Sequence, residues 1–171
     1  MSLDKPRLLA DLLDRLGGPL QLYARQWSNA PEDVVQEALV ELAGQREWPA
    51  NPRAWLFRVV RNRAISQSRA AQSRRRHEGA AAEQARAWFD QRWRLQGELE
   101  LAAEVLAGLP VELREVVVAH FWGGLTFNEI GELTGTSSST AHRRFEAALL
   151  ALRERMEVPC PNKTPCPNQT E

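Results

Sequence analysis

The residues of this sequence best suited to chemistry stand together near its C-terminal end. They are hydroxyl, imidazole and guanidinium side chains in one short run: Ser138, Ser139, Thr140, His142, Arg143 and Arg144. Hydroxyl and arginine groups bind phosphates and base edges, whereas an ordinary solvent-facing helix would carry more glutamate. No carboxylate or cysteine pattern gives His142 a catalytic or metal-binding role. The run therefore predicts contact with nucleic acid.

Two short helices joined by a tight turn are expected to position these side chains. Thr126 can cap the first helix, and Glu129 completes a capping box. Gly135 then ends that helix, because glycine readily adopts the left-handed conformation. Ser137 or Ser138 can cap the second helix. This is the geometry of the DNA-binding helix-turn-helix, although a plain corner between two helices carries the same signals.

The second helix should bury an apolar side and leave the polar run outward. Small residues, Gly131 and Ala141, fall where the two helices must approach closely. Apolar residues recur at helical spacing and are expected to face inward: Ala141, Phe145, Ala148, Leu149 and Leu152. His120, in an apolar stretch, is expected to pack rather than to react.

Charge is balanced across the chain but not along it. The 171 residues carry 22 basic and 22 acidic side chains, for a formal net charge of zero. Residues 53–76 contain no acid and many arginines: Arg53, Arg58, Arg61, Arg63, Arg69, Arg74, Arg75 and Arg76. Acids gather on either side, among them Glu32, Asp33, Glu37, Glu41, Glu112 and Glu115. The arginine segment is an electrostatic footprint for phosphates, and the acidic segments are expected to face something basic.

Helical spacing recurs along almost the whole chain, and no stretch alternates convincingly as a strand. Helices are expected at 3–16, 19–27, 32–43, 53–68, 99–109 and 110–122, with Gly17-Gly18 ending the first and Gly123-Gly124 the last. The expected fold is all-α, with two small helical domains joined by a linker and the helix-turn-helix in the second. The boundaries are 1–68 for the first domain, 69–97 for the linker, 98–157 for the second domain and 158–171 for a disordered tail.

The sequence predicts neither a cofactor nor a metal. Its only cysteines, Cys160 and Cys166, lie in the proline-rich tail without the further ligands that tetrahedral zinc needs. No nucleophile-base pair and no glycine-rich phosphate loop is present, so no enzyme is expected. No apolar run is long enough to cross a bilayer and no targeting segment opens the chain, so a cytoplasmic protein is expected.

Three segments carry a joint signal. They are EDVVQEALVEL from Glu32, PRAWLFRVVRNRAI from Pro52, and LPVELREVVVAHFWGGLTFNEIGELTGTSSSTAHRR from Leu109. In this order and spacing they resemble the sigma-seventy family of bacterial transcription initiation factors. The short two-domain form is similar to the extracytoplasmic-function group, which has regions two and four only. The resemblance implies a nucleoid-associated factor that binds core RNA polymerase and directs promoter recognition.

The resemblance assigns polymerase binding to the first of these segments. In the family, a Glu-Asp-x-x-Gln-Glu helix binds the clamp coiled coil of the largest polymerase subunit, and here it corresponds to Glu32, Asp33, Gln36 and Glu37. Carboxylates and an amide on adjacent helical turns suit a basic partner helix. A solvated acidic face at a helix N-terminus is the plain alternative.

The second segment is similar to the family helix that contacts the minus-ten promoter element. The loop before this segment is similar to a family loop that captures a flipped base. The implied minus-ten residues are Trp48, Asn51, Trp55, Arg58, Arg61, Asn62 and Arg63. Extracting a base costs roughly a few kcal/mol, which stacking and edge hydrogen bonds can offset. Trp55 is more simply explained as core packing, because large aromatic residues usually anchor a core.

The third segment resembles region four, which reads the minus-thirty-five element and docks on the flap of the second-largest subunit. The polar run that opens this section corresponds to its reading residues, and an anti-sigma partner is a further implication. Four positions depart from the family pattern. Ser66 replaces a frequent Asp, Ala43 a common aromatic residue, and Ser139 and His142 a frequent Gly and Lys. These departures leave the promoter sequence and the docking affinity open.

Two other functions fit parts of the sequence. A stand-alone helix-turn-helix regulator would bind an operator without polymerase and would dimerise to match two half-sites. A helical protein-interaction module that has lost its DNA contacts would show no salt-dependent DNA binding. The acid-free arginine segment argues against the interaction module.

Overall fold

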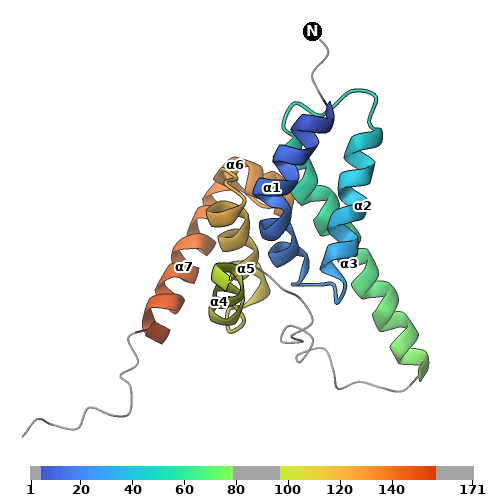
Figure 1. The fold of residues 1–171 in the computed structure, drawn as a ribbon. Helices are drawn as coiled ribbons and strands as arrows, with labels where there is room; N and C mark the ends of the chain where they lie inside the picture. Colours follow the sequence, from blue (N-terminus) through green and yellow to red (C-terminus); the bar gives the residue numbers. More distant parts are fainter. Residues whose placement is uncertain (1–4, 79–96, 157–171) are drawn as a thin grey trace, which may run out of the picture.

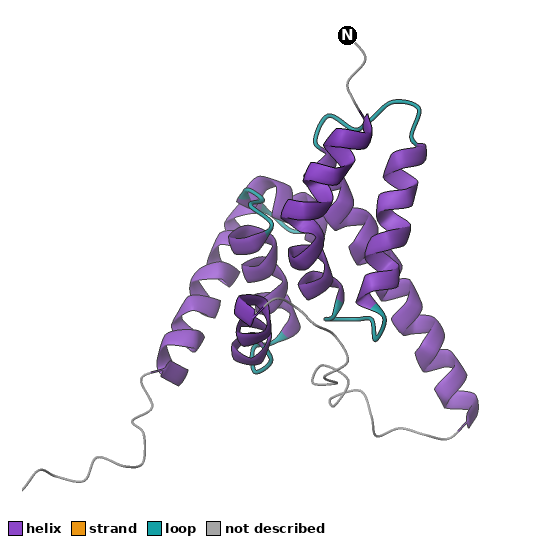
Figure 2. Ribbon diagram, in the orientation of Figure 1, coloured by secondary structure: helices purple, strands orange, loops and turns teal. Residues whose placement is uncertain are grey.

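The computed structural model describes residues 5–78 and 97–156, and within these ranges it contains helices and no strand (Figure 2). The all-α prediction is confirmed. Figure 1 shows two groups of helices side by side, α1 to α3 in one unit and α4 to α7 in the other. The predicted tail and most of the predicted linker lie outside the described residues.

Three helices form the first unit: α1 (Lys5–Ala24), α2 (Pro31–Gly44) and α3 (Pro52–Glu78). Each packs an apolar stripe against the other two. Val35, Leu39 and Leu42 of α2 are buried in this core. Pro31 stands at the first turn of α2, where its fixed φ favours the helix and its missing N–H costs nothing.

The predicted break at Gly17-Gly18 is wrong, because α1 continues through both glycines and through Pro19. Leu16 and Leu20, one turn apart on the same face, are both buried in the core. Glycine and proline cost a helix interior roughly 1 and 3 kcal/mol relative to alanine. Most helical stability comes from packing of an apolar face, and here that packing outweighs the local preference.

Helix α3 is longer than predicted, since it continues past Ser68 to Glu78. The added residues are rich in Ala, Gln and Arg, which are good helix formers. In Figure 1 this end of α3 extends beyond the other helices of its unit. The boundary at residue 68 falls inside a helix, and the division into domains stays a prediction.

The second unit contains α4 (Gly97–Leu106), α5 (Val111–Val117), η2 (Val118–Trp122), α6 (Phe127–Thr134) and α7 (Ser138–Met156). The helix predicted to run from Pro110 through Trp122 consists of α5 and then η2, a wide π turn. In η2 the N–H of Gly123 donates to the carbonyl of Val118 at 3.0 Å. Gly124 then leaves the helix with a φ of 63°, as the glycine pair predicted.

The two units pack against each other, a contact that the sequence did not predict. Helix α1 lies against η2 and α4, and α3 lies against α6. At the centre, fully buried Phe57 approaches Gly123 so closely that a Cβ there would lie 2.5 Å from the ring carbon Cζ. Tyr23, also fully buried, meets Phe57 edge-on with ring centroids 4.9 Å apart. One hydrophobic core therefore runs through both units.

Candidate nucleic-acid interface

The turn between α6 and α7 has the predicted geometry. The N–H of Thr126 donates to Glu129 Oε2 at 2.7 Å and the N–H of Glu129 donates to Thr126 Oγ1 at 3.3 Å, so the capping box is complete. Gly135 ends α6 with a φ of 71°. A Cβ on Gly131 would lie 2.8 Å from the backbone oxygen of Thr136. The close approach of the two helices therefore requires glycine at this position.

The capping box also holds a negative charge at the start of α6. The backbone hydrogen bond from Thr126 lowers the pKa of Glu129, helped by the side chain of Asn51 and the charge of Arg53. The ionised carboxylate is favourable there, because the N-terminus of a helix carries partial positive charge.

Ser137 caps α7, which decides between the two serines considered. Its Oγ accepts a hydrogen bond from the N–H of Thr140 at 3.1 Å. Ala141 and Ala148 are buried as predicted, but Leu149 is 47% exposed, so its inward placement is wrong. On the polar run, Ser139, His142 and Arg143 are exposed and Ser138, Thr140 and Arg144 are half-buried.

Arg143 and Arg144 of α7 form no ion pair with any acid in the described ranges. Arg143 Nη2 donates to the hydroxyl of Thr140 at 3.4 Å, a contact within the same helix. His142 leans toward α6: its ring meets Phe127 edge-on at 4.9 Å, and its Nδ1 lies 3.5 Å from a carboxylate oxygen of Glu146. Both guanidinium groups remain available to an outside anion.

His120 packs, as expected. Its ring stacks on Phe127 with centroids 4.4 Å apart and meets Phe145 edge-on at 4.8 Å. Its Nδ1 lies 2.7 Å from the carbonyl oxygen of Leu125. These contacts join η2 to α6 and α7.

On α3, Arg61 has a carboxylate partner from the other unit. Its Nε lies 2.5 Å from Glu115 Oε1, and Tyr23 Oη donates to the same oxygen at 2.7 Å. The side chain of Glu115 is 5% exposed and that of Arg61 is 23% exposed. Removing one partner of a buried ion pair typically costs about 3–5 kcal/mol. Glu115 therefore joins α1, α3 and α5 at one atom.

The pKa shifts follow from this geometry. Burial opposes the charge of Arg61, but the hydrogen bond and the charge of Glu115 outweigh it and raise the pKa of the guanidinium. Burial first, and the neighbouring Glu115 second, raise the pKa of Tyr23 well above its ordinary value. The phenol therefore stays protonated and keeps its role as a hydrogen-bond donor.

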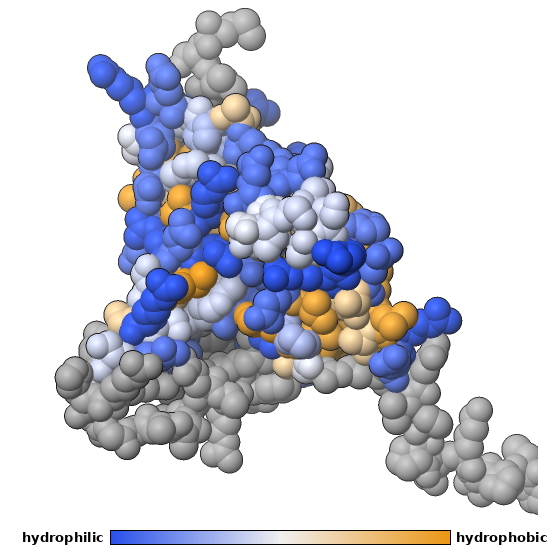
Figure 3. Space-filling model, turned by 180° about the vertical axis from the view of Figure 1, so that it is seen from behind, coloured by the Kyte–Doolittle hydropathy of each residue, from blue (hydrophilic) through white to orange (hydrophobic). Residues whose placement is uncertain are grey.

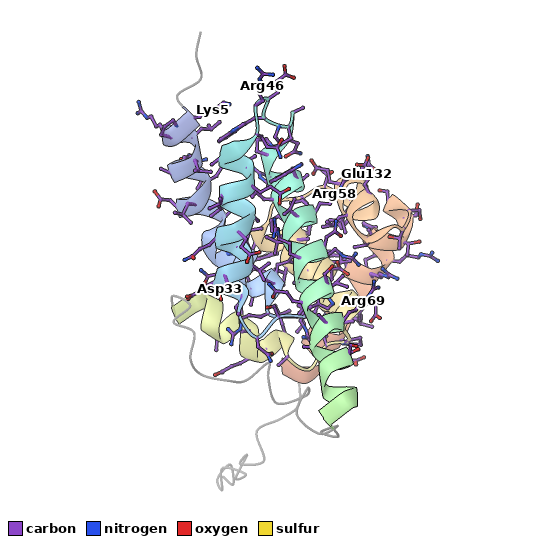
Figure 4. All side chains as sticks on the ribbon, turned by 90° about the vertical axis from the view of Figure 1, so that its right-hand side faces the viewer. Lys5, Asp33, Arg46, Arg58, Arg69 and Glu132 are labelled. Carbon is purple, nitrogen blue, oxygen red and sulfur yellow. The ribbon has the colours of Figure 1, made fainter. Side chains whose placement is uncertain are left out.

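Around this centre, Asn51 just before α3 and two arginines near its start, Arg53 and Arg58, reach across to the second unit. Their contacts are Arg53 Nη1 to Gly124 O at 3.1 Å, Asn51 Nδ2 to Glu129 Oε1, and Arg58 Nη2 to Glu132 Oε2 at 3.7 Å. Figure 4 shows Arg58 and Glu132 facing each other between α3 and α6. Exposed ion pairs contribute about 0–1 kcal/mol, so this rim is weaker than the buried centre.

The remaining minus-ten candidates lie at the edge of the core or on the surface. Trp55 is half-buried against the core, in line with the packing interpretation. Trp48 also packs against the core, and its buried Nε1 has no hydrogen-bond partner among the residues that the structure describes. Asn62 is exposed.

Arg63 contacts acids within its own unit. Its Nη1 lies 2.7 Å from Glu37 Oε2 and its Nη2 lies 2.5 Å from Glu41 Oε2. The hydrogen bond to Glu41 raises the pKa of Arg63 against a small desolvation cost. A residue expected to bind DNA thus holds α3 to a residue expected to bind polymerase.

The acidic face of α2 is open to solvent. Asp33, Gln36 and Glu37 are exposed and Glu32 is half-buried. Among them stands Val40, which is 72% exposed and which sequence analysis missed. A shallow groove of about 580 Å³ on this face is lined by Asp33, Gln36, Glu37, Val40, Glu41 and Arg63.

A second groove, also missed from sequence, is apolar. It has a volume of about 350 Å³ and lies between α4, η2 and α7, lined by Leu101, Ala102, Val105, Leu106, Val117, Phe121, Trp122, Leu149 and Leu152. Phe121 is 70% exposed, which is unusual for a phenylalanine in a globular unit. Figure 3 shows hydrophobic side chains gathered on this side, close to where the chain leaves α7. An exposed apolar patch of this kind marks a site for a partner.

Within residues 5–78 and 97–156, no group of three or more His, Cys, Asp or Glu side chains could hold a metal ion. No helix in the same ranges is long and apolar enough to cross a membrane. Cys160 and Cys166 lie outside the described residues.

The fold and its exposed faces define a two-unit helical protein of the helix-turn-helix class. Two family profiles match the chain: "Sigma-70 region 2" over residues 12–75 and "Sigma-70, region 4" over residues 99–152. The ECF RNA polymerase sigma factor SigL of Mycobacterium tuberculosis is 31% identical over 164 residues, and the match covers 85% of this chain and 87% of that protein.

Two solved structures of sigma factors also match the fold of this chain. The sigma factor RpoE of Bartonella quintana, in complex with the anti-sigma factor NepR, matches with a TM-score of 0.66 and 25% identity, covering 88% of this chain and 97% of that one. CnrH, in complex with the cytosolic domain of CnrY, shares the fold at a TM-score of 0.59 and 24% identity over 91% of each chain. The chain belongs to the sigma-70 family of RNA polymerase sigma factors, in the extracytoplasmic-function group. It is an initiation factor that binds core RNA polymerase and directs it to promoters.

Proposed function

We propose that the two units of this sigma factor carry separate polymerase and promoter contacts. The face of α2 binds the clamp coiled coil of the polymerase, α3 and the loop before it meet the minus-ten element, and α7 reads the minus-thirty-five element. The observation that carries the proposal is that α2 and α7 each present a polar, solvent-exposed face, on opposite flanks of the molecule (Figure 1). Two linked binding sites bind more tightly and more specifically than either site alone, because the second binding event becomes intramolecular.

The chemistry of α2 supports the clamp contact. Asp33, Gln36 and Glu37 lie on adjacent turns and can make charge-assisted hydrogen bonds to a basic helix. Exposed Val40 gives the same face an apolar centre that a partner helix would cover. A purely solvated acidic face would not need that valine.

The chemistry of α7 supports promoter reading. Arg143 and Arg144 have no acidic partner in the described parts of the chain, and a bidentate arginine discriminates guanine by about 1–3 kcal/mol. The hydroxyls of Ser139 and Thr140 suit phosphates, which set the register of the helix on the duplex. The steric limit at Gly131 fixes α7 relative to α6, so the reading side chains have a defined position.

The apolar groove between α4, η2 and α7 supports a third contact, with the polymerase flap. Phe121 and Leu149 leave apolar surface that a short amphipathic helix can bury. An anti-sigma partner is expected as well, since RpoE of Bartonella quintana binds the anti-sigma factor NepR. The chain is expected to act by binding and not as a catalyst, in the cytoplasm where the polymerase works.

Run-off transcription with purified bacterial core polymerase tests this division of labour. The templates are promoter candidates from upstream of the gene for this chain. Asp33→Ala is expected to weaken both core binding and initiation, while Arg143→Ala/Arg144→Ala is expected to weaken initiation and leave core binding intact. Asp14→Ala, an exposed acid on α1, is the matched control for lost charge.

The outcome also separates the alternatives. If the chain does not bind core polymerase but shifts the mobility of duplex DNA by itself, it is a stand-alone regulator. An Arg143→Ala/Arg144→Ala chain that loses core binding as well as initiation would contradict the separate roles of α2 and α7.

A further inference from the structure

A single carboxylate stands on the exposed side of α7, beside the residues expected to read DNA. Four exposed side chains recur at spacings of three and four residues and form one stripe along the helix: Ser139, His142, Arg143 and Glu146. Glu146 is the only acid in residues 138–152. The polar run predicted from sequence ended at Arg144 and did not include it.

Glu146 lies within the part of α7 that a major groove can enclose. An α-helix rises about 1.5 Å per residue, so roughly 10 Å along the axis separates Ser139 from Glu146. The major groove is about 12 Å wide and receives the first turns of a recognition helix. The next residue, Ala147, is exposed and small, so it leaves room for DNA to approach. A base edge can therefore reach Glu146 while Arg143 contacts the same duplex.

The contacts of Glu146 leave one of its carboxylate oxygens without a partner. Its Oε2 lies 3.5 Å from Nδ1 of His142. Arg143 stands on the same stripe but forms no ion pair with Glu146. No group in the described ranges donates a hydrogen bond to Oε1. This oxygen is an exposed acceptor, ready for a donor from outside the chain.

A pair that only stabilises the helix is the plain alternative, and the order of its two residues argues against it. In an i, i+4 pair the favourable order places the acid before the cation, in agreement with the helix dipole. Here His142 precedes Glu146, and their side chains are 51% and 63% exposed. An exposed pair in the less favourable order adds little to the stability of α7.

We propose that Glu146 reads a cytosine in the minus-thirty-five element. The inference rests on the proposed function of α7. In the major groove only cytosine and adenine carry an amino group that can donate a hydrogen bond, and a carboxylate suits the N4 amino group of cytosine. Guanine presents two acceptors at its edge, which would face the carboxylate without any donor. The same side chain therefore selects cytosine and rejects guanine.

The test uses the holoenzyme, assembled from core polymerase and the full chain, and a pool of promoter duplexes. The pool keeps the minus-ten region of a template that supports run-off transcription, and its minus-thirty-five region is randomised. Sequencing of the bound duplexes gives the enrichment of each base at each position. Glu146→Ala and Glu146→Gln are compared with the wild type. Glu154→Gln removes another exposed acid of the same helix, about two turns further from its N-terminus, and is the matched control.

The wild type is expected to enrich cytosine about tenfold at one position. Glu146→Ala should lose the preference at that position alone. Glu146→Gln should favour adenine there, because an amide pairs with both N6 and N7 of adenine. Glu154→Gln should match the wild type.

Three results would overturn the inference. The Glu146 variants could keep the wild-type preference at every position, or they could change binding equally for all sequences. The preference that Glu146→Ala loses could also be for a base other than cytosine. Binding to core polymerase, measured for each variant, is expected to stay at the wild-type level because Glu146 is exposed.

Failure of the proposed function would look different. If neither the wild type nor Arg143→Ala/Arg144→Ala enriches any base in the randomised region, α7 does not read DNA, and both proposals fall. If the arginine variant loses enrichment while the Glu146 variants match the wild type, α7 reads the element and only the role of Glu146 is wrong.

Discussion

Helices α3 and α7 both carry the arginines expected to meet DNA, but their surroundings differ. On α3, Arg61 and Arg63 bind carboxylates at 2.5–2.7 Å, one from the second unit and two from α2. On α7, Arg143 and Arg144 have no acidic partner in the described residues. Arg143 and Arg144 are ready for an outside anion, whereas Arg61 must first exchange an internal one. Sequence composition alone would predict that the arginines of α3 are the more available to DNA, because α3 holds the longer acid-free segment.

The largest effect is expected from removing the internal partner on α3. Arg61→Met leaves Glu115 buried without a cation and should lower the stability of the packed chain by about 3–5 kcal/mol. Chemical denaturation measures the difference. Arg143→Met is the control on α7 and should stay within about 0.5 kcal/mol of wild type, as surface substitutions usually do. Equal losses from both variants would erase the contrast between the helices.

The next effect concerns duplex binding by α7. Arg143→Ala/Arg144→Ala should weaken binding of the holoenzyme to its promoter by about tenfold or more, because each bidentate arginine supplies about 1–3 kcal/mol. Competition binding on promoter and random duplexes gives the loss of specificity. Arg7→Ala/Arg15→Ala removes the same charge from exposed positions of α1 and should leave binding unchanged. A loss that is equal on both duplexes would show that these arginines bind phosphates only.

The fixed position of α7 can be tested at Gly131. Gly131→Ala places a Cβ against the backbone oxygen of Thr136 and should cost about 1–3 kcal/mol. For a chain of this size that corresponds to roughly 2–4 °C in Tm for each kcal/mol. Gly44→Ala meets no atom within 4 Å, so its Tm should be unchanged or slightly higher. If the Tm of Gly131→Ala equals that of the wild type, the turn between α6 and α7 can relax, and the position of α7 does not depend on glycine at 131.

The smallest effect is expected at Glu129, where the capping box of α6 also contacts Asn51. Its pKa is lowered in the folded chain, so its stabilisation is present above the unfolded value near pH 4.3 and is lost as the pH falls through the folded value. Glu129→Gln should lower stability at pH 7 by about 0.3–1 kcal/mol. Thermal melts from pH 7 to pH 3 should converge for wild type and variant. A difference that persists at pH 3 would show that charge is not the cause.

The sequence predicted the helix-turn-helix correctly, because each of its signals is a residue whose type directly determines a local contact or backbone conformation. Thr126, Glu129, Gly131 and Gly135 each make a contact or adopt a conformation that their residue types require. The break at Gly17-Gly18 was wrong because burial of Leu16 and Leu20, a tertiary effect, decides that region. Local propensity is a weak guide wherever packing competes with it.

The partners of the α3 arginines could not be predicted, because they come from residues far along the chain. Glu115 gave one usable sign, since it stands just before the apolar run Val116 to Ala119 and is itself buried. A carboxylate in such a place needs a partner. The sequence does not say which arginine supplies it. For Glu37, Glu41 and Glu115, the basic group that the acids were expected to face is an arginine of the same chain.

The π turn η2 has a consequence for chain length. A π turn holds one residue more than the α-helical turn it replaces, and it behaves like a single-residue insertion absorbed inside a helix. The bond from Gly123 N–H to Val118 O spans that extra residue. A chain one residue shorter between positions 118 and 122 could therefore keep Gly123 and the helix-turn-helix in register with α5. It would lose the wide turn that contains Phe121, a residue lining the apolar groove, so this segment can change the groove while the helix-turn-helix keeps its register.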